Sequence, residues 1–336
     1  MKKILMLGTG GTIASCRTEN GLSPQLSPND VLKYIPDAAS VCDIDTLQVC
    51  NIDSTNMTPA CWKMLVETIR THYDHYDGFV ICHGTDTMAY TAAALSYMIQ
   101  DSPKPIVITG AQKPINVDNT DARVNLLDSI IYAADEASQN VCLVFDGKVI
   151  VGTRAKKDRA KSYNAFSSIN FPYLAVIQDR AIIRYIPQTP VRGRVRFYTK
   201  MAEDVCVLKL TPGQKPDILE YLFDHYAGIV IESFGVGGIP QSLMDTFYRL
   251  MQREEAKRKM IVLTTQVENE GSNMTIYEVG RKVKQDFNLM EAFDMTLEAT
   301  ITKLMWLMGN VEESRRKELF YHTINLDFLF NELSAK

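Results

Sequence analysis

A hydroxyl and a carboxylate stand next to each other at Thr85 and Asp86, within the segment His83-Gly84-Thr85-Asp86-Thr87. The segment follows an apolar, β-rich run over 78–82 and precedes apolar residues that recur at helical spacing over 88–100. The pair is therefore expected on a loop between a strand and a helix. In open parallel sheets, ligands bind beyond the carboxyl ends of the strands, where helix N-termini offer free backbone N–H groups. This placement favours chemistry by an alcohol nucleophile.

A second threonine, Thr12, lies in a similar position, because it follows the apolar run 4–7 through the stretch Gly8-Thr9-Gly10-Gly11. This stretch does not match a dinucleotide-binding loop, since Ile13 stands in the third position and the acidic residue expected about 20 residues further on is missing. The Gly-Lys-Ser/Thr of a phosphate-binding loop is also absent. We therefore expect no nucleotide cofactor. The glycines are interpreted as allowing the backbone to approach a small ligand that Thr12 faces.

Thr12, Thr85 and Thr87 each have a simpler interpretation, because a threonine before a helix commonly caps its free N–H groups. Considered singly, each is more readily explained as a cap. Asp86 changes this balance for Thr85, since an alcohol is a weak nucleophile that needs an adjacent base. A lone carboxylate is a poor base for an alcohol, so a further group is expected.

A desolvated lysine would be a better base, and the segment 152–161 contains Lys156 and Lys157. Several charges close together are typical of a solvated surface loop, and this alternative stays open. The residues alone do not distinguish Lys156 from Lys157.

Polar residues also follow a third expected strand, at Asp53 and Ser54. Ser54 is either an ordinary turn serine or a ligand for a polar substrate. His83 is placed to orient the loop that follows it. The other histidines have no metal-binding partner at helical spacing, which disfavours a zinc hydrolase; they are His72, His75, His225 and His322.

Composition narrows the class of protein. The chain has 336 residues, of which 46% are hydrophobic, which is enough for two packed cores. Its formal charge of −4 gives no reason to expect nucleic acid or an anionic membrane as a partner. The apolar run near the N-terminus is too short for a signal peptide, and no run is long enough to span a membrane. The 7 cysteines show no metal-binding spacing, so we expect free thiols, no metal and a cytoplasmic location.

Strand-like and helix-like segments alternate along the chain, which predicts an α/β fold with mostly parallel sheets. We expect a larger N-terminal α/β domain over 1–186, a linker rich in proline and arginine over 187–204, and a smaller C-terminal α/β domain over 205–336. The first domain would contain all the candidate residues. The expected strands are 3–7, 47–52, 79–82, 106–109 and 141–145 in the first domain and 205–210, 229–231 and 261–264 in the second.

These motifs together resemble the bacterial-type L-asparaginase family, especially its cytoplasmic type I branch. Residues 10–15 are similar to its first signature and residues 83–88 to its second. Further matches occur at 53–54, 109–111, 233–240 and 294–300. The resemblance covers nearly the whole chain, and it implies an asparaginase-like architecture of two α/β domains.

The resemblance also implies roles for particular residues. Thr12 would attack the side-chain amide of L-asparagine and form a β-aspartyl enzyme, which water converts to L-aspartate. Thr85, Asp86 and Lys157 would form a second catalytic group, and Lys157 is chosen because it stands 9 residues before Phe166, as in the family pattern. No metal or organic cofactor is implied. The residues that would bind the substrate are Asp53, Ser54, Thr55, Thr85, Asp86 and the backbone of Ala111.

One position departs from the family pattern. Many relatives carry a tyrosine on the loop after the first threonine, whereas this chain has Leu22 there. The role of that tyrosine is therefore not transferred. Sites of this family also include groups from a partner protomer, which implies a homodimer or homotetramer.

Three other functions fit part of the pattern. A glutaminase-asparaginase of broader specificity would use the same residues. The amidase component of an archaeal tRNA amidotransferase is disfavoured, because an extension precedes its first strand, whereas here the expected strand begins at Lys3. A non-catalytic amino-acid sensor is also disfavoured, because binding alone does not need two alcohols and a lysine.

Overall fold

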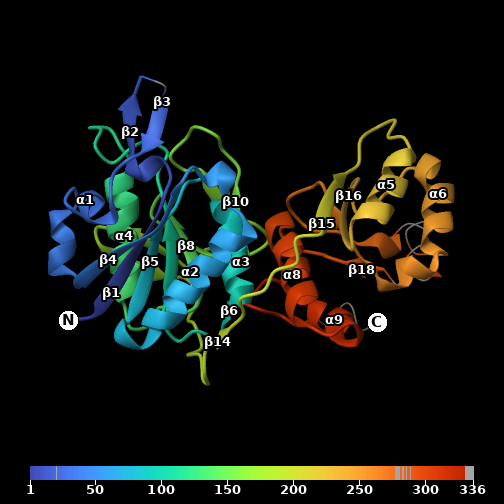
Figure 1. Cartoon of the computed structure of the whole chain (residues 1–336). Helices are drawn as coiled ribbons and strands as arrows, with labels where there is room; N and C mark the ends of the chain where they lie inside the picture. Colours follow the sequence, from blue (N-terminus) through green and yellow to red (C-terminus); the bar gives the residue numbers. More distant parts are fainter. Residues whose placement is uncertain (20, 277–280, 282–283, 285, 288, 330–336) are drawn as a thin grey trace. The chain divides into compact units, whose positions relative to one another are not determined.

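The computed structural model describes the chain except for residues 20, 277–280, 282–283, 285, 288 and 330–336. The chain divides into two compact units, Met1–Thr199 and Lys200–Lys336. Each unit is an α/β structure with its own sheet (Figure 1). The predicted fold class, with a larger and a smaller α/β part and mostly parallel strands, is confirmed.

The first unit contains an eight-stranded sheet with the order β13-β12-β9-β8-β7-β5-β1-β4. Strands from β8 to β4 are parallel neighbours, whereas β9, β12 and β13 are added in antiparallel fashion and were not predicted. The predicted strands are present, and the one expected over 47–52 begins earlier. The bounds are β1 (Lys3–Gly10), β4 (Asp43–Ile52), β5 (Gly78–Cys82), β7 (Ile106–Thr109), β8 (Val141–Phe145), β9 (Lys148–Val151), β12 (Ala175–Gln178) and β13 (Ala181–Arg184).

The strand order creates a topological switch point between β1 and β5. Along the chain, β1 is followed by β4, which lies on one side of it, and then by β5, which lies on the other side. Open α/β sheets bind their ligands beyond the carboxyl ends of the strands at such a point. Thr12 follows β1 and Thr85 follows β5, so the fold brings the two threonine loops to this position.

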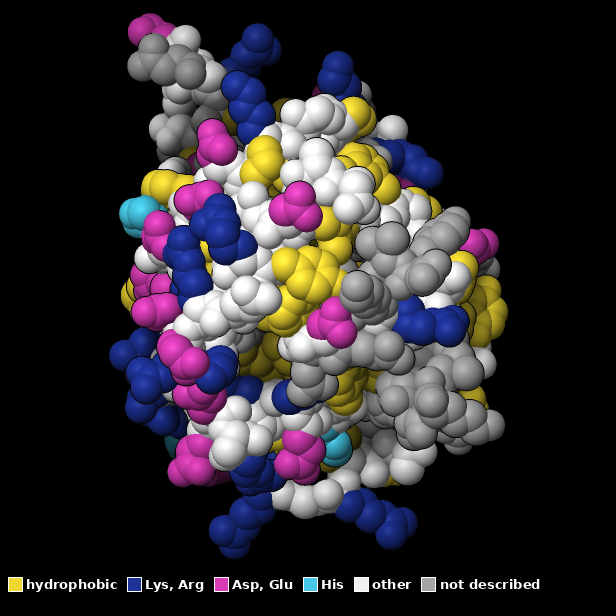
Figure 2. All heavy atoms as spheres, turned by 90° about the vertical axis from the view of Figure 1, so that its right-hand side faces the viewer, with side chains coloured by type: hydrophobic (Ala, Val, Ile, Leu, Met, Phe, Trp, Pro, Cys, Tyr) yellow, Lys and Arg dark blue, Asp and Glu magenta, His cyan; other side chains and the backbone are white. Residues whose placement is uncertain are grey.

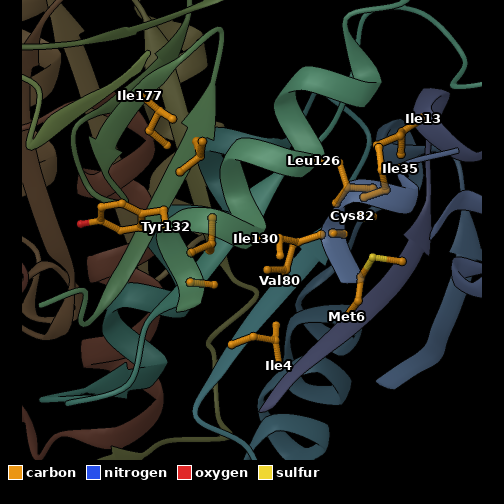
Figure 3. Close-up of a cluster of buried hydrophobic side chains, with 14 of the residues drawn as sticks. Ile4, Met6, Ile13, Ile35, Val80, Cys82, Leu126, Ile130, Tyr132 and Ile177 are labelled. Carbon is orange, nitrogen blue, oxygen red and sulfur yellow. The ribbon is translucent and has the colours of Figure 1, made fainter. Parts of the chain in front are cut away.

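Helices cover both faces of this sheet. Ile4 and Met6 of β1 pack with α4 residues in one hydrophobic core cluster, which Figure 3 shows, while α2 and α3 lie on the other face. The α3 helix is buried along nearly its whole length, and the helical pattern expected to 100 ends at Met98. The bounds are α1 (Pro28–Leu32), α2 (Pro59–His72), α3 (Met88–Met98) and α4 (Ala122–Ala134), with the short 3-10 helices η1 (Thr12–Ala14), η2 (Pro36–Ser40), η3 (Ser54–Asn56) and η4 (Tyr73–His75).

Short antiparallel pairs complete the first unit. The segment 152–161 is not a loop throughout, because β10 pairs with β11 and places Lys157 opposite Phe166. The β2–β3 hairpin follows η1, the short helix that begins at Thr12, and β6 pairs with β14 near the end of the unit. The bounds are β2 (Ser15–Thr18), β3 (Gly21–Pro24), β6 (Ile99–Gln100), β10 (Ala155–Lys157), β11 (Phe166–Ser168) and β14 (Arg196–Phe197).

The second unit contains a four-stranded parallel sheet in the order β15-β16-β17-β18. The three predicted strands are present, and β18 was not predicted. On the face shown in Figure 2, cationic and anionic side chains are interspersed. The bounds are β15 (Val205–Lys209), β16 (Gly228–Ser233), β17 (Met260–Thr265), β18 (Met290–Glu291), α5 (Asp217–His225), α6 (Gln241–Met251), α8 (Leu297–Asn310), α9 (Glu313–Phe320), η5 (Glu254–Arg258) and η6 (Met274–Ile276).

None of the helices in the described ranges is long and apolar enough to cross a membrane. All 7 cysteines are free thiols. Burial raises the pKa of Cys82 to about 12 and also raises the pKa of Cys142. Because the thiolate is the reactive form, these two side chains are packing residues.

A buried chain of hydrogen bonds fixes the end of β5. The Trp62 indole donates to the Thr91 hydroxyl at 2.9 Å, and that hydroxyl lies 2.9 Å from His83 Nε2. His83 Nδ1 lies 2.6 Å from the Gly84 carbonyl oxygen. An indole can only donate and a carbonyl can only accept, so Thr91 donates to Nε2 and His83 donates from Nδ1. Burial lowers the pKa of His83 to about 4, so this neutral tautomer persists at physiological pH.

The smaller unit has a buried ion pair with a comparable role. Lys303 Nζ of α8 lies 2.7 Å from Asp327 Oδ2, and both side chains are fully buried. Lys303 also donates to the His322 carbonyl, and Asp327 accepts from the Ile324 backbone N–H. Burial lowers the pKa of Lys303. The pair attaches the segment after α9 to α8.

The His83 network predicts a specific acid sensitivity. The His83 pKa is about 4 in the folded protein and about 6.5 when unfolded, so the unfolded state binds more protons between these values. The free energy of unfolding should therefore fall as the pH drops from about 6.5 to about 4, with about 3 kcal/mol due to His83. In urea unfolding over this pH range, the free energy of unfolding of His83→Gln should fall by about 3 kcal/mol less than that of wild type. His225→Gln is the control, and equal losses in all three proteins would contradict a neutral, buried His83.

The Lys303–Asp327 pair predicts an asymmetric mutational effect. Lys303→Met leaves the Asp327 carboxylate buried beside an apolar group and should lower the free energy of unfolding by about 3–5 kcal/mol. Adding Asp327→Leu removes the isolated charge and should restore part of that loss. Urea unfolding of both variants measures the difference. A double variant no more stable than the single one would show that the buried charge is not the cause.

Candidate active site

None of the three candidate threonine side chains caps a helix, although Thr87 stands at the N-cap position of α3. The Thr12 hydroxyl forms no hydrogen bond to any residue that the structure describes, although it begins η1. The Thr85 hydroxyl donates to Gln112 Oε1 at 3.3 Å, and Thr87 donates to the Ser54 carbonyl at 2.7 Å. The simple capping interpretation is therefore wrong. Thr87 instead connects the loop after β5 to the loop after β4 through its hydrogen bond to Ser54. The Thr12 hydroxyl can rotate toward a ligand.

Two glycine-containing loops meet at the carboxyl ends of β1 and β5. A Cβ placed on Gly11 would lie 2.4 Å from Gly84 Cα, and a Cβ on Gly84 would lie 2.6 Å from Ser54 Oγ. Gly11 also has a φ of +74°, a backbone conformation that other residues seldom adopt. The Thr12, Thr85 and Ser54 loops can approach this closely only because glycine stands at both positions.

Thr85, Asp86 and Lys157 form one hydrogen-bonded group. The Lys157 ammonium donates to Thr85 Oγ1 at 2.8 Å and to Asp86 Oδ1 at 2.6 Å. The side chain of Lys157 is 17% exposed and that of Asp86 is 56% exposed, so the group faces solvent on its carboxylate side. The sequence did not decide whether Lys156 or Lys157 belongs to the site. In the structure, the β10–β11 pairing positions Lys157 next to Thr85.

The residues after β4 have different surroundings. Ser54 is buried, and its hydroxyl accepts a hydrogen bond from the Asp86 backbone N–H at 3.3 Å. Asp53 caps η3 by accepting from the Thr55 backbone N–H at 2.9 Å and from the Thr55 hydroxyl at 3.0 Å. Asp53 and Thr55 are both exposed. Ser54 therefore supports the Asp86 loop, while Asp53 and Thr55 lie beside it at the surface.

Ala111 is fully buried in the loop after β7. The buried Asp121 carboxylate holds this loop by accepting from the Gln112 backbone N–H at 2.9 Å. Asn125 donates to the Gly110 carbonyl at 3.0 Å. Burial raises the pKa of Asp121 while hydrogen bonds oppose this shift. Asp121 and Gln112 were missed in the sequence, where the one available signal was an aspartate just before the helix that becomes α4.

The hairpin after Thr12 carries Leu22, the position at which the family resemblance led us to expect a tyrosine. Leu22 lies on β3 and is 56% exposed. A different aromatic residue, Tyr163, lies in the loop between β10 and β11 and donates to the Asn119 carbonyl. The Lys113 ammonium lies 5.4 Å from the centre of its ring. These contacts attach the loop that follows Lys157 to the loop that follows β7.

The arrangement joins the Thr85 hydroxyl, the Lys157 ammonium and the Asp86 carboxylate, and the loop that carries Thr12 meets the loop that carries Thr85. A hydroxyl can attack a carbonyl carbon when a base removes its proton, and a lysine held against a second hydroxyl can supply or take that proton. Backbone N–H groups of the glycine-containing loops can stabilise an oxyanion. Within the described residues, no group of three or more His, Cys, Asp or Glu side chains could hold a metal ion. The geometry suits acyl transfer from a small amide or ester.

Two family models match the chain. The model "Asparaginase, N-terminal" matches residues 3–189, and the model "Glutaminase/Asparaginase C-terminal domain" matches residues 204–320. Together they cover most of both units.

Individual relatives are similar over most of this chain. The L-asparaginase of Thermococcus kodakarensis is 39% identical over 93% of this chain and 94% of its own, and L-asparaginase 1 of Escherichia coli K12 is 33% identical over 92% of each chain. The solved structure of the Thermococcus kodakarensis enzyme matches with a TM-score of 0.89, covering 97% of this chain and 99% of that one. A glutamyl-tRNA(Gln) amidotransferase component of Methanosphaera stadtmanae is 35% identical over 93% of this chain and 73% of its own. With both domain models matched and relatives this similar along the whole chain, the protein belongs to the asparaginase family.

Proposed function

We propose that this protein hydrolyses the side-chain amide of L-asparagine to give L-aspartate and ammonia. The observation that carries the proposal is the Lys157 ammonium held at 2.8 Å from the Thr85 hydroxyl and 2.6 Å from the Asp86 carboxylate, beside the loop that carries the unbonded Thr12 hydroxyl. Two of the relatives named above are L-asparaginases, which supports the same substrate. A pure amino-acid sensor would not need this proton-transfer group.

In the proposed reaction, the Thr12 oxygen attacks the amide carbon as its proton passes to a base. The resulting tetrahedral oxyanion collapses, and the amide nitrogen receives a proton as the C–N bond breaks, so that it leaves as ammonia. A β-aspartyl ester of Thr12 remains. Water then attacks the ester carbon, the C–O bond to Thr12 breaks, and Thr12 regains its proton as L-aspartate forms. Each step needs one proton moved toward or away from a group at the site.

Thr85 and Lys157 are proposed to move these protons. In its neutral form, Lys157 can take a proton through Thr85, and in its charged form it can return one to the departing nitrogen. The Asp86 carboxylate lies 2.6 Å from the ammonium and holds it beside Thr85. The pair is partly exposed, and a bound substrate would exclude water from it.

The substrate's charged ends are assigned to the loops after β4 and β5. The Asp53 and Asp86 carboxylates would bind the α-ammonium group, and Ser54 and Thr55 would bind the α-carboxylate with hydroxyl or backbone groups. The Ala111 backbone would contact the side-chain amide. A homodimer or homotetramer is proposed as the active form, and a cytoplasmic location is proposed from the resemblance to the type I branch.

A glutaminase-asparaginase is the second candidate function. It is favoured by one finding, the match of the C-terminal model whose description names both glutaminase and asparaginase. Glutamine differs from asparagine by one methylene, and pockets discriminate against a methylene by about 10–200-fold.

Ammonia release from the two amino acids separates the candidates. For a strict asparaginase, kcat/KM for L-asparagine should exceed that for L-glutamine by at least about tenfold, because the longer side chain misplaces the amide carbon relative to Thr12. Initial rates over a range of concentrations of each substrate give the ratio. Equal efficiencies would replace the first candidate by the second, and no release from either would refute both.

Removal of the proposed nucleophile gives a second prediction. Thr12→Val keeps the shape of the side chain but lacks the hydroxyl, so turnover of asparagine should fall at least about a thousandfold. Aspartate binding, measured by calorimetry, should persist because the groups after β4 and β5 are unchanged. Thr12→Ser should retain part of the activity, and the exposed Thr71→Val is the control. Unchanged turnover in Thr12→Val would remove Thr12 from the mechanism.

A further inference from the structure

The Gln112 side chain connects Thr85 to the loop that follows Lys157. Its Oε1 accepts from the Thr85 hydroxyl at 3.3 Å, and its Nε2 donates to the Ser162 carbonyl at 3.1 Å. Gln112 directly follows Ala111 and is half-buried. It therefore lies between the Thr85 hydroxyl and the β10–β11 hairpin that carries Lys157, and it contacts both parts of the site.

The hydrogen bonds that link Lys157, Thr85, Gln112 and Ser162 can run in only one direction. A carbonyl only accepts, so the Gln112 nitrogen must face Ser162 and its oxygen must face Thr85. The amide oxygen also only accepts, so Thr85 must point its single hydroxyl hydrogen at Gln112. The lone pairs of the Thr85 oxygen are then left for the Lys157 ammonium, which lies 2.8 Å away. The direction is Lys157 to Thr85 to Gln112 to Ser162.

The backbone of Gln112 is held by a hydrogen bond to Asp121. The Gln112 N–H donates to Asp121 Oδ2 at 2.9 Å, and the neighbouring Lys113 N–H donates to Asp121 Oδ1 at 3.0 Å. Asp121 is 7% exposed and also accepts from Asn125 Nδ2 at 3.2 Å. With the main chain fixed by a buried carboxylate, the Gln112 side chain has few alternative positions.

We propose that Gln112 is a positioning residue that sets the direction of the Thr85 hydroxyl hydrogen. It keeps the lone pairs of the Thr85 oxygen turned toward Lys157, so that the lysine donates to Thr85 and does not accept from it. For Lys157 to take a proton from Thr85, the hydrogen must turn away from Gln112 and toward the lysine nitrogen. Gln112 thus determines how readily the relay changes between its two forms. This inference rests on the proposed function, because it assigns Thr85 and Lys157 to proton transfer.

Two substitutions should shift the pH dependence in opposite directions. Gln112→Met has a similar length but no acceptor, so Thr85 is free to donate to a neutral lysine. Gln112→Glu places a carboxylate behind Thr85, which, together with Asp86, favours the ammonium. The midpoint of the rising limb of the pH–kcat profile should move down by about half a unit in Gln112→Met and up by about one unit in Gln112→Glu.

The kinetic constants should change unequally. At the wild-type optimum pH, kcat for asparagine should fall about five- to tenfold in both variants, because the Thr85 hydroxyl is no longer held in one direction in Gln112→Met and is held too strongly away from the lysine in Gln112→Glu, while KM changes less than about twofold. Gln139→Met is the matched control, because Gln139 also joins two backbone groups, the Thr189 carbonyl and the Val191 N–H, in a different part of the first unit. It should leave both the midpoint and kcat unchanged.

The outcomes separate this inference from the proposed function. If wild type releases ammonia from asparagine and both Gln112 variants keep the wild-type midpoint, Gln112 does not set the hydroxyl direction, and the function stands. Shifts of the same sign in both variants would also overturn the inference, because they would indicate general loosening of the loop. If wild type does not release ammonia from asparagine, the proposed function is refuted, and the inference that rests on it is refuted as well. Thermal unfolding of each variant confirms that the folded protein is compared.

Discussion

The close approach of two loops at the switch point of the larger sheet is the constraint on which the site depends. Gly11 and Gly84 are so near each other that a methyl group on Gly11 would overlap the Gly84 backbone. The two parallel strands that precede these loops are hydrogen-bonded neighbours, β1 and β5, so their ends are fixed in register. The threonines that follow are then brought to one edge without any direct contact between their side chains being required.

A one-directional set of hydrogen bonds is built on this framework. His83 is locked in one tautomer on the interior side of the β5 loop, and the Lys157, Thr85 and Gln112 groups have one order of donors and acceptors on the outer side. Both sets end at backbone carbonyls, which cannot reverse their role. The main-chain carbonyls at the end of each set therefore determine the direction in which the side-chain hydrogen bonds run.

Much of this could be predicted from local pattern, and the remainder depends on pairing between distant segments. The parallel strands and the loops with Thr12, Thr85 and Ser54 follow from apolar runs and adjacent polar residues. The antiparallel strands β9 to β13 were missed because they are only 3 or 4 residues long and their pairing, not their composition, defines them. Gln112 and Asp121 were missed for the same reason, since an ordinary amide and a helix-preceding aspartate gain meaning only from their partners.

The position of Ile13 has a consequence for how this family can vary. Its fully buried side chain, with the Ser15 hydroxyl bonded to the Gly11 carbonyl at 2.9 Å, anchors the turn on both sides of Thr12. Leu22, on β3, is not among the residues that make these contacts. A substitution at an exposed position such as Leu22 therefore leaves the contacts that hold the threonine turn unaltered.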